Sequence, residues 1–271
     1  MDNYAVIGSP IAHSRSPTIH HLFAEQLGHE ITYKKLEADE KSFEEHVESF
    51  FTKGGKGLNV TLPFKKQAFS MSDNLSSNAK ECGAVNTLSF SEDGRISGES
   101  TDGIGLIEDL KSNEVVIEDK SILIVGSGGT AQSIIPQLVA NSAQQLSLSN
   151  RTIENAISLK EQYIHLLDIT CLEGELINRN FDIVINTTSA HLEGTLPVIN
   201  PVAIQNSVCY DVNYSYGETI FQKWSTENGA KKSLQGWGML VEQAAESFYI
   251  WRGIRPKTRE IIDRLSSEPE N

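Results

Sequence analysis

A glycine-rich segment follows an apolar run near the middle of the chain. The run Ser121 to Val125 leads directly into Gly126, Ser127, Gly128, Gly129, Thr130 and Ala131. In a Gly-x-Gly-x-x-Ala segment the first glycine permits a tight turn, the second lets the backbone approach a pyrophosphate, and the alanine allows close packing of the following helix. The helix N-terminus then offers free N–H groups to phosphates. The segment predicts dinucleotide binding; the alternative is a strand–helix turn without a ligand.

A second segment, residues 59–65, carries groups suited to acid–base chemistry. Asn59 and Thr61 lie on the same face of a predicted strand. Lys65 follows in a first helical turn, where the helix dipole does not favour a lysine. Together with the polar strand end, the predicted cofactor turn and Asp102, this placement makes Lys65 a candidate for catalysis. The alternatives are a solvated lysine and a helix-capping aspartate.

Three further polar residues are candidates for binding. Ser14 and Ser16 precede a helix, and two hydroxyls at a helix N-terminus can hold a carboxylate. Ser16 is alternatively an N-cap, with Pro17 at the first helical position. Asn86 is a ligand-binding amide or a buried amide satisfied by the backbone. The histidines lack partners at metal-ligand spacing, so we expect no metal site.

The end of the second strand of the dinucleotide region indicates which cofactor is used. Asn150, Arg151 and Thr152 stand where an NAD-binding chain usually places an acidic residue. An arginine instead suits a 2′-phosphate through a charged bidentate contact. We therefore predict NADP, against the alternative of a surface arginine.

The elements that position these residues alternate between strand and helix. The first part has predicted strands at residues 4–8, 31–36 and 57–61, helices starting at Ser16, Ser42 and Pro63, and a hairpin over 84–98. A helix over 101–110 is interpreted as a bridge. Beyond it lie strands at 122–125, 146–149, 182–186 and 208–212, with helical stretches between them. This alternation predicts a parallel, doubly wound sheet. A last helix covers 239–252, and the tail 266–271 is expected to fray.

Composition bounds the function further. The chain has 271 residues with 39% hydrophobic and 22% charged residues, as in globular enzymes. A formal charge of -13 argues against nucleic acid as a partner. No apolar run approaches the ~20 residues that span a bilayer, and the N-terminus lacks a secretory pattern. Three scattered cysteines suggest a reducing cytoplasm.

Taken in order, these motifs resemble the shikimate dehydrogenase family over nearly the whole chain. The matching segments are residues 14–17, 59–65, 83–87, 101–103, the glycine turn at Gly126, 150–152 and 238–243. The resemblance implies an α/β fold in which an N-terminal α/β substrate domain (1–101) precedes a Rossmann-type NADP domain (102–236). C-terminal helices (237–271) would return to the substrate domain.

The resemblance also implies an activity, the NADPH-dependent reduction of 3-dehydroshikimate to shikimate, and a role for each matching residue. Lys65 and Asp102 would form the catalytic pair. Both would also bind the substrate, together with Ser14, Ser16, Asn59, Thr61, Asn86, Tyr214 and Gln243. The cofactor would lie on Gly126, Ser127, Gly128, Gly129, Thr130, Ala131, Asn150, Arg151, Thr152, Thr187 and Gly236. The expected partner is the small-molecule substrate, with no nucleic acid and no membrane, for a cytoplasmic monomer or homodimer.

Several positions depart from the family pattern, most of them near the predicted cofactor site. They are Ser100, Gln132, Asn155, His191, Glu218 to Ile220, Gln235 and Trp237. A second arginine often stands at the position of Asn155, so NADP preference is expected to be weaker than usual. Two alternatives remain, a quinate/shikimate relative that uses NAD and a non-catalytic ligand-binding protein on the same scaffold.

Overall fold

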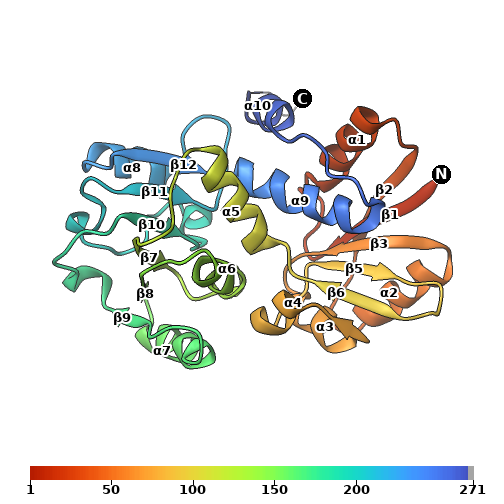
Figure 1. The fold of residues 1–271 in the computed structure, drawn as a ribbon, viewed down its shortest axis with the longest axis horizontal. Coiled ribbons are helices and arrows are strands. Elements are labelled where there is room, and N and C mark those ends of the chain that lie inside the picture. Colours follow the sequence, from red (N-terminus) through yellow and green to blue (C-terminus); the bar gives the residue numbers. More distant parts are fainter. Residues whose placement is uncertain (268–271) are drawn as a thin grey trace. The chain divides into compact units, whose positions relative to one another are not determined.

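The computed structural model describes residues 1–267 and divides the chain into two compact units. Unit 1 consists of Met1–Gly105 and Val241–Ile261. Unit 2 consists of Leu106–Leu240 and the described residues from Ile262 onward. The chain leaves unit 1 in helix α5 (Asp102–Ser112) and returns in α9 (Trp237–Arg252), so both helices have residues in each unit (Figure 1). No helix within residues 1–267 is long and apolar enough to cross a membrane.

Unit 1 is built on a six-stranded mixed sheet in the order β2-β1-β3-β5-β6-β4. The strands are β1 (Asp2–Gly8), β2 (Ile31–Glu37), β3 (Gly55–Val60), β4 (Asn74–Leu75), β5 (Thr87–Phe90) and β6 (Ile96–Glu99). Strands β1, β2 and β3 are parallel, whereas β5 is antiparallel to β3 and to β6. The helices are α1 (Ser16–Leu27), α2 (Phe43–Thr52), α3 (Lys65–Met71) and α4 (Ser77–Cys82).

The two faces of the unit 1 sheet bury different groups. Ala5, Ile7 and Leu58 face a core that includes Phe43 and Val47 of α2. The opposite face carries an aromatic cluster in which Tyr4 stacks on Trp251 of α9 and Tyr33 stacks on His20 of α1. Strand alternation produces this division, because successive side chains point to opposite faces.

Unit 2 contains a six-stranded sheet, parallel throughout, in the order β12-β11-β10-β7-β8-β9. Its strands are β7 (Ser121–Val125), β8 (Gln145–Ser149), β9 (Thr170–Leu172), β10 (Ile183–Asn186), β11 (Val208–Asp211) and β12 (Lys232–Gln235). The α-helices are α6 (Gly129–Ala140), α7 (Ile153–Tyr163) and α8 (Ile220–Glu227), with short 3-10 turns at Gly174–Leu176, Ala190–Glu193 and Pro201–Ile204. Helix α10 (Arg259–Ser267) has residues in both units.

Alternating side chains of β7 enter separate cores on the two sheet faces. Ile122 and Ile124 pack with α5 and α6, whereas Leu123 and Val125 pack with Phe181 and Phe221. A parallel sheet with both faces covered is the doubly wound arrangement predicted from the sequence, and the α/β fold class is confirmed.

Two predicted helix starts are wrong. Pro63 lies in a turn and the helix begins two residues later, at Lys65. Ser16 is the first helical residue of α1 and not its N-cap, because the cap position is occupied by Arg15 without a side-chain hydrogen bond. In the predicted tail, Ser266 and Ser267 belong to α10, and residues 268–271 lie outside the described part of the chain.

Candidate functional site

In unit 1, Lys65 and Asp102 form an ion pair at the starts of two helices. Lys65 is the first residue of α3 and Asp102 is the first residue of α5. The Lys65 Nζ atom lies 2.5 Å from Asp102 Oδ2, and the two side chains are 17% and 12% exposed. A largely buried charge-assisted hydrogen bond fixes the direction of the ammonium, which has two further N–H groups to offer.

Asn86 links this pair to a buried network. Its Nδ2 atom donates to the second Asp102 oxygen over 2.8 Å and to Thr101 Oγ1 over 2.9 Å. Its Oδ1 atom accepts the Thr101 backbone N–H over 2.8 Å. Gln243 of α9 adjoins the network, since its Oε1 atom lies 3.4 Å from Asn86 Nδ2. Asp102 is therefore bonded to two neighbours and has a fixed orientation, which a simple helix cap would not need.

Asn59 is held by protein groups at both ends of its amide. Its Oδ1 atom accepts from the Tyr33 hydroxyl over 2.6 Å. Its Nδ2 atom donates to Ser247 Oγ over 3.0 Å and to Thr87 Oγ1 over 3.2 Å. Burial raises the pKa of Tyr33 well above its usual value, so this hydroxyl remains a donor. The bonds leave Oδ1 one lone pair for a ligand hydroxyl.

Ser14, Ser16 and Thr61 complete the unit 1 candidates. The Ser14 hydroxyl donates to Ser16 Oγ over 3.3 Å and accepts the Ser16 backbone N–H over 3.3 Å, so Ser14 and not Ser16 bonds the start of α1. Thr61 directly follows β3, where its N–H donates to Ile7 O over 2.9 Å. All three residues are partly exposed.

Sequence reasoning did not identify Ser247, Tyr33 or Thr101 as parts of this network. Ser247 is fully buried and lies one helical turn after Gln243, and its hydroxyl contacts Asn59 and Thr87. The i, i+4 spacing of Gln243 and Ser247 places them on one face of α9 and was the available signal. Tyr33 offered no such signal, because an aromatic residue in a strand is ordinarily read as core.

Unit 2 contains a cavity of about 620 Å³ at the carboxyl ends of β7, β8 and β10. Seven of the residues predicted to bind the cofactor line it: Gly126, Ser127, Gly128, Asn150, Arg151, Thr152 and Thr187. In open parallel sheets, ligands bind beyond the carboxyl ends of the strands. Gly129, Thr130, Ala131 and Gly236 are not among the lining residues; the first three form the first turn of α6, where Ala131 is fully buried.

The glycines of the turn have two different roles. Gly126 has a φ of +108°, and a Cβ there would lie 2.5 Å from Thr187 Oγ1. By contrast, a Cβ on Gly128 or Gly129 would meet no atom within 4 Å. The backbone conformation and the contact with Thr187 thus require a glycine at position 126, whether or not a ligand binds. Gly128 and Gly129 leave open space at the N-terminus of α6, where backbone N–H groups can receive an anion.

Arg151 is the cation of this cavity. It is exposed, and it forms no ion pair within residues 1–267. Asn155 lines the same cavity but carries no charge. One unpaired guanidinium is therefore available for a phosphate at the end of β8.

Tyr214 lies in unit 2, on a loop held by residues that depart from the family pattern. Gln235 accepts the Ser215 N–H over 2.9 Å and donates to Gly217 O over 2.9 Å. The Tyr214 ring packs on Trp237 with centroids 4.4 Å apart, and the indole N–H donates to Ser215 O. Gly236 lies against the backbone just after β11, because a Cβ there would be 2.1 Å from Val212 O. Gln235 and Trp237, the two residues that depart from the family pattern, therefore hold the loop that carries Tyr214.

Comparison with known proteins identifies the segments that form these sites. Residues 6–88 match the shikimate dehydrogenase substrate binding domain, residues 109–207 match shikimate / quinate 5-dehydrogenase, and residues 236–265 match the shikimate 5'-dehydrogenase C-terminal domain. The chain is 44% identical over 266 residues to a shikimate dehydrogenase (NADP(+)) of Aeromonas salmonicida, covering 98% of this chain and 97% of that protein.

Solved structures show the same likeness in three dimensions. An Ael1 enzyme from Pseudomonas putida is 37% identical with a TM-score of 0.90, covering 99% of both chains. A shikimate 5-dehydrogenase from Thermus thermophilus, solved in complex with NADP(H) and shikimate, is 28% identical with a TM-score of 0.88. That match covers 98% of this chain and all of the other.

Proposed function

Because the chain belongs to the shikimate dehydrogenase family, we propose that its two sites carry out the NADPH-dependent, reversible reduction of 3-dehydroshikimate to shikimate in aromatic amino-acid (chorismate) biosynthesis. Unit 1, completed by α9, holds the substrate, and unit 2 holds the dinucleotide. The observation that carries this proposal is the Lys65–Asp102 pair at 2.5 Å, joined through Asn86 to a network of buried amides and hydroxyls.

The unit 2 cavity fits a phosphorylated dinucleotide. Its volume of about 620 Å³ falls in the usual range for cofactor sites. Gly128 and Gly129 leave open space at a helix N-terminus, which suits the pyrophosphate. Arg151 supplies a charge for the 2′-phosphate, and Asn150 and Thr152 flank it on the cavity wall. Bound NADPH supplies the hydride that reduces the ketone carbon of the substrate.

Lys65 supplies the proton for the same reaction. As the ketone becomes an alcohol, its oxygen gains negative charge, and the Lys65 ammonium both stabilises that charge and donates a proton to it. Asp102 holds the ammonium in place while its second oxygen stays bonded to Asn86. In the reverse direction, neutral Lys65 removes the proton from the substrate hydroxyl.

The remaining polar residues of unit 1 bind and orient the substrate. Ser14 and Ser16 receive its carboxylate near the start of α1, where the hydroxyls already lie 3.3 Å apart. Asn59, Thr61, Asn86 and Gln243 bind the ring hydroxyls. Tyr214, which belongs to unit 2, stays a predicted substrate-binding residue. The prearranged amides limit the reorganisation that binding requires, which favours a near-attack geometry.

The test is to follow nicotinamide absorbance with shikimate and NADP, in parallel with NAD and with quinate. Turnover of shikimate with a clear preference for NADP is the expected result. Turnover mainly with NAD or with quinate would instead place the chain with the quinate/shikimate relatives. Folded protein that binds shikimate without turning over any pair would contradict an enzymatic role.

The proposed setting is the cytoplasm, with a small-molecule substrate as the partner and no nucleic acid. The three cysteines support a reducing compartment, because Cys82, Cys171 and Cys209 are all free thiols. The formal charge of -13 also opposes binding to a phosphate backbone. We propose a monomer or homodimer, which sedimentation of the purified protein would distinguish.

A further inference from the structure

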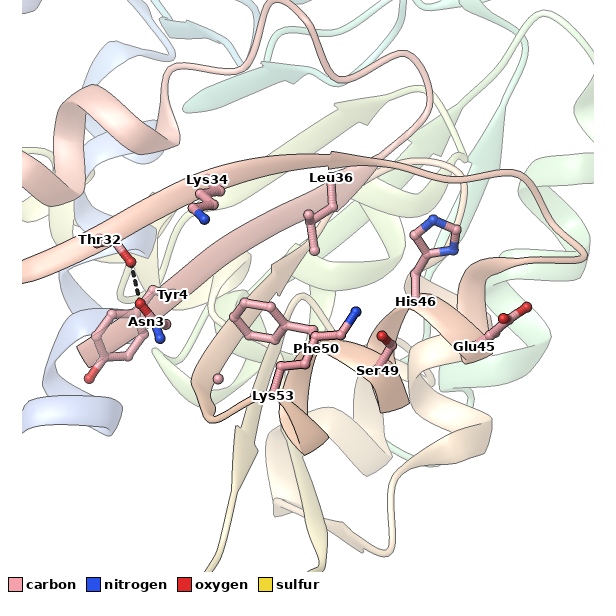
Figure 2. A pocket seen from close by; sticks show the side chains of 11 residues that line it. Asn3, Tyr4, Thr32, Lys34, Leu36, Glu45, His46, Ser49, Phe50 and Lys53 are labelled. Carbon is pink, nitrogen blue, oxygen red and sulfur yellow. Dashed lines mark hydrogen bonds between the residues drawn. The ribbon is translucent and has the colours of Figure 1, made fainter. Parts of the chain in front are cut away.

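A groove in unit 1 lies apart from the residues assigned above. It has a volume of about 410 Å³ and runs between edge strand β2 and helix α2 (Figure 2). The residues that matter for its chemistry are Lys34, Leu36, His46, Phe50, Lys53 and Gly55. We call it the β2–α2 groove. Its volume lies in the range of small-molecule sites, ~300–1,000 Å³.

The β2–α2 groove and the proposed substrate residues use opposite faces of the sheet. Lys34 and Leu36 alternate along β2 with Tyr33, whose hydroxyl reaches Asn59. Lys34 pairs with Ala5, and Ala5 and Ile7 belong to the core beneath α2. A molecule in the β2–α2 groove would therefore not compete with a substrate that is bound at Asn59.

The floor of the groove is apolar. Leu36 and Phe50 are only partly buried, and each packs one side against the core. Gly55 leaves the space that the Phe50 ring occupies, because a Cβ there would be 2.3 Å from the ring. Figure 2 shows the ring facing the strands beneath Lys34 and Leu36. A flat hydrocarbon group would cover this floor.

The rim of the groove carries positive charge without a protein counterion. Lys34 and Lys53 are exposed, and neither forms an ion pair within residues 1–267. His46 Nδ1 is engaged with Ser42 O at 2.7 Å, which leaves its Nε2 atom for a ligand. Glu45 is the acidic lining residue, and its carboxylate points away from Phe50 in Figure 2. Uncompensated lysines are notable in a chain with a formal charge of -13.

From this combination we propose that the β2–α2 groove binds a small aromatic monocarboxylate. The ring lies on Phe50 and Leu36, and the carboxylate lies between the ammonium groups of Lys34 and Lys53. Two flexible ammonium ions suit a single carboxylate. The groove lining contains no arginine and no helix N-terminus, so it lacks the bidentate and helix-dipole contacts that favour a phosphate over a carboxylate.

Calorimetric titration with 2-naphthoate tests the proposal, and 2-naphthamide serves as the uncharged probe. We expect 1:1 binding of the carboxylate and much weaker binding of the amide. The double variant Lys34→Gln/Lys53→Gln should weaken 2-naphthoate binding about tenfold, because two partly solvated charge contacts are lost. Lys56→Gln is the matched control, since Lys56 is exposed on β3 of the same sheet but does not line the groove.

A second variant separates the groove from the substrate site. Ser14→Ala/Ser16→Ala removes the proposed carboxylate seat there and should leave 2-naphthoate binding unchanged. Equal binding by the lysine variant and the unaltered protein would overturn the proposal, as would equal binding of the amide or no binding at millimolar probe.

Discussion

At the scale of single residues, Lys65 is the decisive position. Its Nζ atom lies 2.5 Å from Asp102, so replacing it removes the proposed proton donor while the amide network around Asn86 remains. We predict that Lys65→Met lowers kcat by about 10²–10⁴-fold with a modest change in the KM for shikimate. The adjacent exposed residue provides the control, and Lys66→Met should be nearly silent. A raised KM with unchanged kcat would make Lys65 a binding residue.

Single residues also determine the preference for NADP over NAD. Arg151 lacks an internal counterion, so Arg151→Ala should raise the KM for NADP about tenfold and leave that for NAD nearly unchanged. Asn155 lines the same cavity, and Asn155→Arg should lower the KM for NADP by adding a second cation. Steady-state kinetics with NADP and with NAD measure these changes in KM. If both cofactors responded equally to Arg151→Ala, the residue would not contact the 2′-phosphate.

At the scale of elements, replacement by alanine should have opposite effects at two glycines near helix starts, one on stability and the other on cofactor binding. A Cβ on Gly238 in α9 would lie 1.8 Å from Asp109 Oδ1, and Asp109 is buried and holds the Tyr210 hydroxyl at 2.6 Å. Gly238→Ala should therefore cost ~1–3 kcal/mol of unfolding free energy. A Cβ on Gly128 meets nothing, so Gly128→Ala should preserve stability but weaken NADP binding. Urea unfolding and NADP titration of both variants measure the contrast.

The elements also show how far sequence reasoning reaches. The alternation of apolar runs and glycine turns predicted the parallel sheet of unit 2, because each buried strand is bounded by residues that end it. The short strand β9 and the polar strand β12 were missed, since neither has an apolar run of its own. The sequence predicts a helix start at Pro63, but a proline fits a turn before a helix equally well, and α3 begins at Lys65.

The candidate site was predictable only in part, because some of its residues are joined only by contacts between distant segments of the chain. Lys65, Asn86 and Asp102 were selected by residue type and by resemblance, and the structure brings them into one hydrogen-bonded group. Ser247 and Tyr33 complete that group from α9 and β2, distant in sequence from Asn59. The spacing of Gln243 and Ser247 places both on one face of α9, but it does not predict that this face meets Asn59, because that contact depends on tertiary packing.

At the scale of the whole molecule, a buried histidine links stability to pH. His20 is fully buried among aromatic rings, and neither ring nitrogen has a hydrogen-bond partner in the described structure. Burial lowers the pKa of His20 to about 3. The unfolded chain binds a proton near pH 6.5 while the folded protein does not, so stability is lost as the pH falls below about 6.5.

Replacing this histidine should flatten that dependence. His20 alone accounts for about 2 kcal/mol of unfolding free energy lost between pH 6.5 and 4.5. We predict that His20→Phe removes this part of the slope, whereas His13→Gln, at an exposed position, retains it. Urea unfolding at several pH values measures the slope. An unchanged slope in His20→Phe would mean that other groups govern the acid sensitivity.

The split of unit 1 into two stretches of chain has a consequence for biosynthesis. On the ribosome, residues 1–105 emerge first, but the second stretch of unit 1, Val241–Ile261, is translated only after the whole of Leu106–Leu240. Until then the nascent sheet lacks Gln243, Ser247 and Trp251, and its aromatic face stays exposed to chaperones. The Leu106–Leu240 part of unit 2, which contains the whole cofactor cavity, is therefore synthesised before unit 1 is complete. A message truncated after Leu240 would yield a fragment that has this cavity but no finished substrate site.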